Sequence, residues 1–161
     1  FMVPLAISNA IAVKVGFANG AGNINDLKKY SFVGVVISVG FMACSALIFA
    51  TFPEFLVRLF SSDEVLIKIS VPILYILAIF QVFDGLQVAL SGIFKGIKKT
   101  GVVLLANFVA YWLISIPFGY ALAFKFHLGL KGFWYGLCSA AVILCSIMLI
   151  MLRKNIKSIE N

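Results

Sequence analysis

Charged residues are scarce in this chain. Of its 161 residues, 12% are Asp, Glu, Lys or Arg, whereas 63% are hydrophobic. The mean hydropathy is +1.11. A chain with so little polar surface cannot solvate itself in water as a globular domain. We therefore predict an integral membrane protein.

Residues that bind metals or form disulfides are also few. The sequence has one His and three cysteines, and no CxxC or Cys/His spacing connects them. The cysteines lie within apolar runs, where we expect them to be buried and reduced. The sequence also lacks G-x-S-x-G, H-E-x-x-H and P-loop motifs. It predicts no enzyme and no bound cofactor.

The formal net charge of +7 could indicate a nucleic-acid partner. However, the Lys and Arg residues lie in short clusters between apolar runs and do not form one basic face. This pattern is typical of loops that border a membrane. We expect membrane lipids and no nucleic acid as partners.

Long apolar runs dominate the remaining sequence. A bilayer core about 30 Å thick requires about 20 apolar residues of helix. Uncharged runs of this length without alternating polar residues do not resemble the strands of a membrane barrel. We predict an all-α bundle of transmembrane helices. The predicted spans cover residues 1–18, which resembles the end of a span, 31–52, 69–94, 102–124 and 132–152.

The orientation follows from the basic residues between these spans. Nine Lys or Arg residues fall on one side and four on the other. The side richer in Lys and Arg usually faces the cytoplasm. We therefore expect a multi-pass protein whose C-terminus is cytoplasmic.

The connection 53–68 holds three of the six acidic residues and should face outside. Within it, Ser61-x-x-Glu64 has the pattern of a capping box that starts the next helix. Leu56, Leu59 and Phe60 recur at helical spacing, which fits either a short interfacial helix or a loop resting on the headgroups. Residues 19–25 are rich in Gly and Asn and predict a cytoplasmic turn.

Asp84 lies deep inside the apolar run 69–94. A charge at the centre of a bilayer costs at least about 2.5–3.5 kcal/mol, so intramembrane acids usually serve a function. Asp84 is therefore our candidate for a proton site or a metal site for Na⁺.

Gln81, Asp84, Gln87 and Ser91 follow one another at spacings of three, three and four. This spacing places them within about a third of the helix circumference. Such a polar stripe should face a bundle interior or a wet cavity. We consider the amides and the serine as candidate cavity-lining residues or as hydrogen-bonding contacts between helices.

In the run 102–124, Asn107, Tyr111 and Ser115 recur every four residues and form a second candidate cavity-lining face. Pro117 removes a backbone donor and Gly119 follows it, which predicts a kink or a local opening. The two residues are a candidate hinge, or a bend fixed by packing.

Several motifs together resemble the multidrug and toxic compound extrusion (MATE) transporters, and most closely their NorM-like branch. The most specific is Gln81-Val-Phe-Asp-Gly-Leu-Gln87. The others are Pro4–Gly16, Gly92–Gly96, Tyr111-Trp112, Pro117-x-Gly119-Tyr120 and Gly129–Trp134. The chain is similar to helices 8–12 of that twelve-helix fold, which implies that residues 1–161 are part of the C-terminal lobe and that the N-terminal lobe is missing.

The resemblance implies a transporter in a bacterial inner membrane that exports small organic cations or drugs in exchange for Na⁺ or H⁺. Asp84 matches the position of the family's essential acid in the tenth helix. Lys95 and Lys14 stand where the family usually has Arg, and Lys lacks the planar donor fork of Arg. Two alternatives are a flippase for lipid-linked oligosaccharides, which has a related fold, and a membrane remnant that transports nothing.

Overall fold

Apolar runs joined by short polar turns form long helices in the computed structural model, which describes residues 2–160. No strand occurs among these residues, which confirms the predicted all-α fold. The helical elements are α1 (Met2–Gly20), α2 (Ile24–Thr51), α3 (Pro53–Arg58), α4 (Glu64–Gly96), α5 (Thr100–Phe108), η1 (Val109–Ser115), α6 (Ile116–Tyr120), η2 (Ala121–Lys125) and α7 (Leu130–Glu160).

By length and composition, five helical stretches could cross a membrane. They are α1, α2, α4, the continuous stretch Thr100–Lys125 and Leu130–Lys157 of α7. Each overlaps one of the predicted apolar runs, and most extend further because polar residues at their ends continue the helix. The helices are therefore longer than the predicted spans, for example at the start of α2 and at the end of α7.

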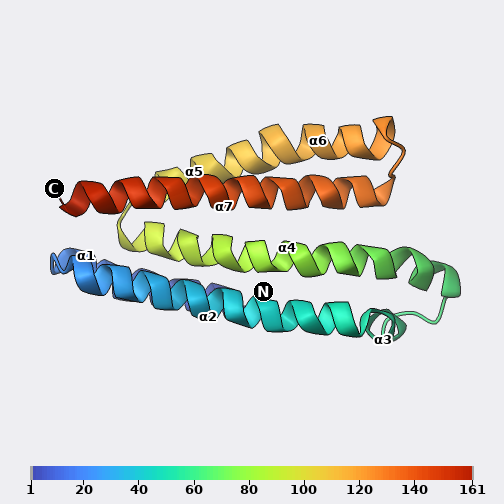
Figure 1. The fold of residues 1–161 in the computed structure, drawn as a ribbon, viewed down its shortest axis with the longest axis horizontal. Coiled ribbons are helices and arrows are strands. Elements are labelled where there is room, and N and C mark those ends of the chain that lie inside the picture. The colour runs from blue at the N-terminus through green and yellow to red at the C-terminus, as the bar shows by residue number, and fades with distance from the viewer. Residues whose placement is uncertain (1, 161) are drawn as a thin grey trace.

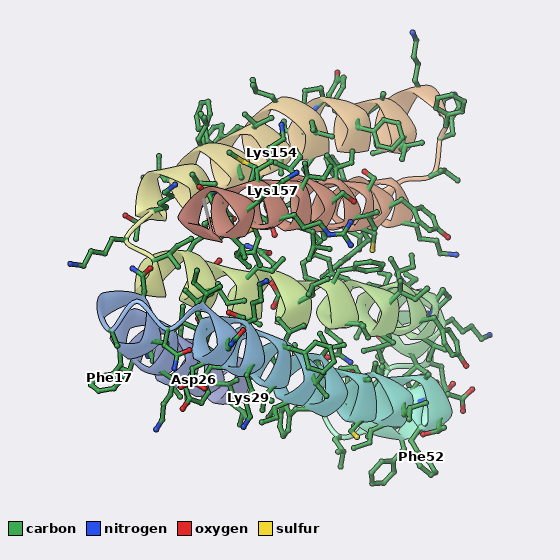
Figure 2. The ribbon with its side chains drawn as sticks, turned by 60° about the vertical axis from the view of Figure 1, so that its left-hand side comes forward. Phe17, Asp26, Lys29, Phe52, Lys154 and Lys157 are labelled. Atoms are coloured by element: carbon green, nitrogen blue, oxygen red, sulfur yellow. The ribbon has the colours of Figure 1, made fainter. Side chains whose placement is uncertain are left out.

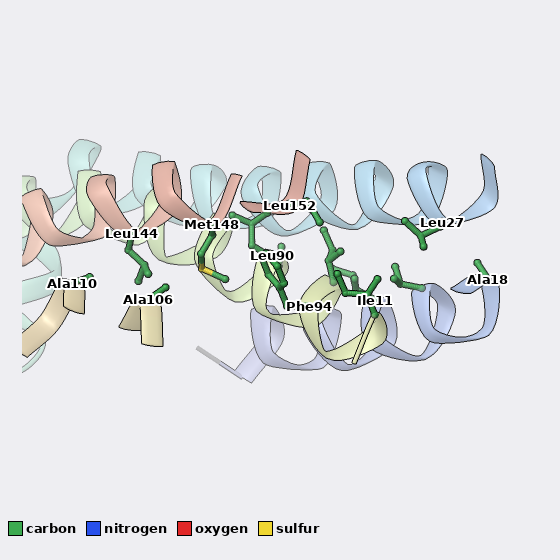
Figure 3. Close-up of a cluster of buried hydrophobic side chains, with 14 of the residues drawn as sticks. Ile11, Ala18, Leu27, Leu90, Phe94, Ala106, Ala110, Leu144, Met148 and Leu152 are labelled. Atoms are coloured by element: carbon green, nitrogen blue, oxygen red, sulfur yellow. The ribbon is translucent and has the colours of Figure 1, made fainter. Parts of the chain in front are cut away.

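Helix α4 lies at the centre of the bundle. It contacts α1 and α2 on one side and α5 and α7 on the other, as Figure 1 shows. The stretch from α5 to η2 packs mainly against α7. Figure 3 shows the apolar core along α4, where Leu90, Phe94 and Met148 are fully buried between the helices.

Small residues bring the helices close together. A Cβ atom added at Gly92 of α4 would lie 2.4 Å from the carbonyl oxygen of Ser8 in α1. A Cβ added at Gly136 of α7 would lie 2.6 Å from the Cα of Gly119 in α6. The backbones of α1 and α4, and of α6 and α7, therefore approach too closely for a larger side chain.

The connections differ in detail from the prediction. The turn in 19–25 is shorter than expected, because α1 continues to Gly20 and Asn23 caps α2 by accepting a hydrogen bond from the backbone of Asp26.

The predicted capping box at Ser61 is wrong. Asp63 is the cap, and its carboxylate accepts from the N–H of Val65 at 2.8 Å, because α4 begins at Glu64. Of the two alternatives for 53–68, the structure has a short helix, α3, which ends at Arg58 before Leu59 and Phe60.

The helix around Pro117 is irregular. Helix α6 contains Pro117 and lies between two π-helical stretches, η1 and η2, in which the turns are wider than in an α-helix. These wider turns are the local opening of the helix near Pro117 and Gly119. A hinge at these two residues stays a prediction.

Candidate functional site

Asp84 lies near the middle of the 33-residue helix α4. Its side chain is partly buried, and within residues 2–160 it has no hydrogen-bond or ion-pair partner. It lies within electrostatic range of the Tyr111 hydroxyl and the Cys145 thiol. An acid at this depth without an ion-pair partner among the described residues is suited to take up a proton or a cation.

Side chains from two other helices hold the backbone on both sides of Asp84. The Sγ of Cys145 in α7 donates to the carbonyl of Phe83 at 3.3 Å. The Oγ of Ser38 in α2 donates to the carbonyl of Gly85 at 2.9 Å. Together the two contacts fix the position of the Asp84 backbone between α2 and α7. The sequence did not single out these two residues for a role, since a small side chain that bonds a backbone carbonyl leaves no spacing pattern.

Next to Asp84, one amide joins α4 to the stretch α5–η1. Gln87 donates through Nε2 to the Oδ1 of Asn107 at 2.8 Å, and its Oε1 accepts from the Tyr111 hydroxyl at 2.8 Å. Asn107 in turn donates to the carbonyl of Val103 at 2.7 Å. We call Gln87, Asn107 and Tyr111 the amide cluster. All three are partly buried.

The remaining residues of the two predicted faces lie at the margins of this cluster. Ser91 donates back to the carbonyl of Gln87 in its own helix at 2.9 Å. Ser115 is buried against α7, where its carbonyl oxygen would lie 3.0 Å from a Cβ at Gly136. Pro117 is exposed, whereas Gly119 is buried beside Phe133 of α7.

Gln81 does not join the amide cluster. Its Oε1 accepts a hydrogen bond from Ser45 of α2 at 3.4 Å. Its Nε2 is buried and has no partner among the described residues. Gln81 and Gln87 are six positions apart, which turns their side chains about 120° from each other on an α-helix. The two edges of the predicted stripe therefore face different helices, and Asp84 lies between them.

The site offers oxygen atoms to a cation. In residues 2–160, no three His, Cys, Asp or Glu side chains gather at one point. The oxygen atoms that could bind a cation are those of the Asp84 carboxylate, the amide oxygen of Gln87 and the hydroxyl oxygen of Tyr111. Oxygen donors suit hard cations such as Na⁺, whereas a carboxylate alone is enough for H⁺.

A family model described as MatE matches residues 1–121, which is most of the chain. The chain belongs to the MatE family. This confirms the resemblance drawn from the motifs, and with the five apolar helices it makes the chain part of a multi-pass membrane protein.

Two relatives illustrate the similarity of this MatE chain to bacterial proteins. It is 34% identical over 154 residues to "Probable multidrug resistance protein NorM" of Mesorhizobium japonicum, an alignment that covers 92% of this chain. It is 36% identical over 153 residues to "Multidrug resistance protein NorM" of Burkholderia vietnamiensis, also over 92% of the chain. The alignments cover 33% of each relative, so the chain spans about a third of their length.

Solved MATE structures share the fold of this MatE chain. An inward-facing and an outward-facing conformation of a multidrug resistance MATE family transporter each match with a TM-score of 0.88 at 20% identity. These alignments cover 99% and 96% of this chain, and 38% and 35% of the respective structures. The eukaryotic MATE transporter AtDTX14 matches with a TM-score of 0.83 at 22% identity, over 98% of this chain and 36% of its own.

Proposed function

We propose that the full-length protein exports small organic cations or drugs in exchange for Na⁺ or H⁺, and that Asp84 binds the coupling ion. The observation that carries the proposal is the unpaired carboxylate of Asp84 in the centre of the central helix. Membership of the MatE family and the names of the NorM relatives support export as the activity.

In this mechanism the ion neutralises Asp84. An ionised carboxylate in an apolar bundle favours the arrangement that leaves it open to water, and a neutral one tolerates closure. The amide cluster holds α4 against α5 and η1, so that a change at Asp84 moves these helices together. Entry of one positive charge down the membrane potential supplies roughly 2.3 kcal/mol per 100 mV.

The charge distribution and the family support a proposal for the location. We place the protein in a bacterial inner membrane, with the C-terminus in the cytoplasm on the side that carries nine of the thirteen basic residues. The N-terminal lobe would supply the second wall of the substrate cavity.

Drug export from cells tests the role of Asp84. Asp84→Asn in the full-length protein removes the charge and keeps the shape, so we expect it to abolish energised ethidium export while the protein still inserts. Glu54→Gln is the matched control, because Glu54 is an exposed acid on α3, away from the cluster. It should export ethidium like the wild type. Export at the wild-type rate by Asp84→Asn would contradict the proposal.

The same cells separate the two alternatives. If the protein is a flippase, deletion of its gene would leave ethidium export unaffected and would cause lipid-linked oligosaccharide to accumulate. If it is a remnant without transport activity, the deletion would change neither ethidium export nor the level of lipid-linked oligosaccharide. Asp84 and the amide cluster suit a cation better than a bulky anionic lipid carrier, because they include a carboxylate and no Lys or Arg.

A further inference from the structure

The net charge of the molecule gathers at one end of the bundle. This is the end where α1 stops, α2 starts, α4 turns into α5 and α7 finishes. Figure 2 shows Lys29 at the start of α2 and Lys154 and Lys157 near the end of α7. Nine basic residues lie at this end, and the acids there are Asp26 and Glu160.

The densest part of this end is formed by two segments that are far apart in the sequence. One is the turn after α4 and the other is the last part of α7. Lys99 donates a hydrogen bond to the side chain of Asn155, which shows that the segments adjoin. We call the following residues the basic patch: Lys95, Lys98, Lys99, Arg153, Lys154 and Lys157. All of them are exposed.

The basic patch has no internal counter-charge. Among the described side chains, which are those of residues 2–157, none of its members pairs with an acid. Like charges on adjoining segments repel one another, and the repulsion opposes the packing of α7 against the turn between α4 and α5. An anionic partner at the patch would remove this repulsion.

Apolar side chains lie directly beside the patch. On α5, Leu104 is 74% exposed and Leu105 is 62% exposed, one to two turns from Lys99. A phospholipid presents the same two chemistries in the same order, with phosphate above acyl chains. Basic pockets between transmembrane helices are typical sites for anionic headgroups.

We propose that the basic patch binds the headgroup phosphates of anionic phospholipids, with Leu104 and Leu105 against their acyl chains. The bound lipid supplies the counter-charge that the described side chains do not give the basic patch, and it stabilises the contact of α7 with the α4–α5 turn. This role is independent of the coupling ion at Asp84.

Thermal unfolding in nanodiscs tests this proposal. The full-length protein is compared in phosphatidylcholine alone and in phosphatidylcholine mixed with phosphatidylglycerol. We expect the unfolding midpoint of the wild type to rise with phosphatidylglycerol. In the variant Lys95→Gln/Lys98→Gln/Lys99→Gln, most of this rise should be lost, because three of the phosphate-binding charges are gone.

The chain offers a control with the same change of charge. Lys68, Lys125 and Lys131 are exposed at the opposite end of the bundle. The variant Lys68→Gln/Lys125→Gln/Lys131→Gln should keep the full rise. Equal losses in the two variants, or an equal rise when inorganic phosphate is added to phosphatidylcholine discs, would overturn the proposal.

A second pair of substitutions covers the case in which the patch variant does not fold. Lys154→Gln/Lys157→Gln changes exposed residues on the last turns of α7. Native mass spectrometry should then detect fewer phosphatidylglycerol molecules retained on this variant than on the wild type. Equal retention would also overturn the proposal.

Discussion

The backbone around Asp84 is held more firmly than its side chain. The carbonyls of Phe83 and Gly85 each accept a hydrogen bond from another helix, whereas the carboxylate between them has no partner in the described part of the chain. A fixed backbone with an unpaired charge keeps the acid in place and leaves its oxygens available. This arrangement would suit the exchangeable ion that we propose for Asp84.

Of the two hydrogen bonds, the one from Ser38 to Gly85 is better suited to a test than the one from Cys145 to Phe83, because a hydroxyl is a stronger donor than a thiol. Ser38→Ala should lower the free energy of unfolding in detergent by about 0.6 kcal/mol, the average for a hydrogen bond between membrane helices. Ser146→Ala is the control, since Ser146 is exposed and bonds within its own helix. Equal losses in the two variants would show that the contact with Gly85 contributes nothing particular.

Tyr111 offers a test of the amide cluster. Tyr111→Phe removes the donor to the Oε1 of Gln87 and leaves that oxygen partly buried without its partner. We expect a loss of about 1 kcal/mol in unfolding free energy. Tyr120→Phe should have little effect, because Tyr120 is 60% exposed. If Tyr111→Phe matched this control, the hydrogen bond would not hold α4 to η1.

Residue type and spacing indicated which residues belong to the candidate site, but not how they pack against one another. Asp84, Gln87, Asn107 and Tyr111 are conspicuous because polar side chains are rare in long apolar runs. Their packing against one another could not be predicted, since spacing along a helix does not say which neighbour it faces.

At the scale of the element, α4 divides the polar stripe between its two sides. Gln81 faces Ser45 of α2 and Gln87 faces α5 and η1. The stripe itself could be predicted from helical geometry. Its division between two partners depends on the bundle, which brings different helices to the two sides of α4.

The close approach of α1 and α4 depends on Gly92. In Gly92→Ala, the new Cβ would meet the Ser8 backbone at 2.4 Å, and backbone cannot yield as a flexible side chain can. We expect a loss of about 1–3 kcal/mol in unfolding free energy. The control is Gly40→Ala in α2, where no atom lies within 4 Å of the added Cβ. It should be neutral or slightly stabilising, because Ala favours helix. Comparable destabilisation by both would mean that loss of glycine itself, and not the contact, is responsible.

Hydropathy predicted which elements exist but not where they end. Helices cover the five apolar runs. The spacing of apolar residues in 53–68 fitted a short helix or a loop equally well, and the structure has the helix α3. The cap of α4 was assigned to Ser61 and lies at Asp63, because several Ser and Asp residues stand close together and each could serve. Local patterns cannot rank such competing caps.

At the scale of the whole molecule, the five-helix unit resembles inward-facing and outward-facing transporters equally well. Both match it with a TM-score of 0.88. The fold of this unit therefore does not distinguish the two states. We expect the transport cycle to change its position relative to the rest of the protein more than its internal packing, with Asp84 biasing that choice.

The most direct test of this account is ion-coupled transport in proteoliposomes. The full-length protein, as wild type and as Asp84→Asn, is reconstituted with a labelled organic cation inside, and an inward gradient of Na⁺ or of H⁺ is imposed. We predict that one of the two gradients accelerates efflux through the wild type and that neither accelerates it through Asp84→Asn. Equal acceleration in the two proteins would contradict the central claim that Asp84 binds the coupling ion.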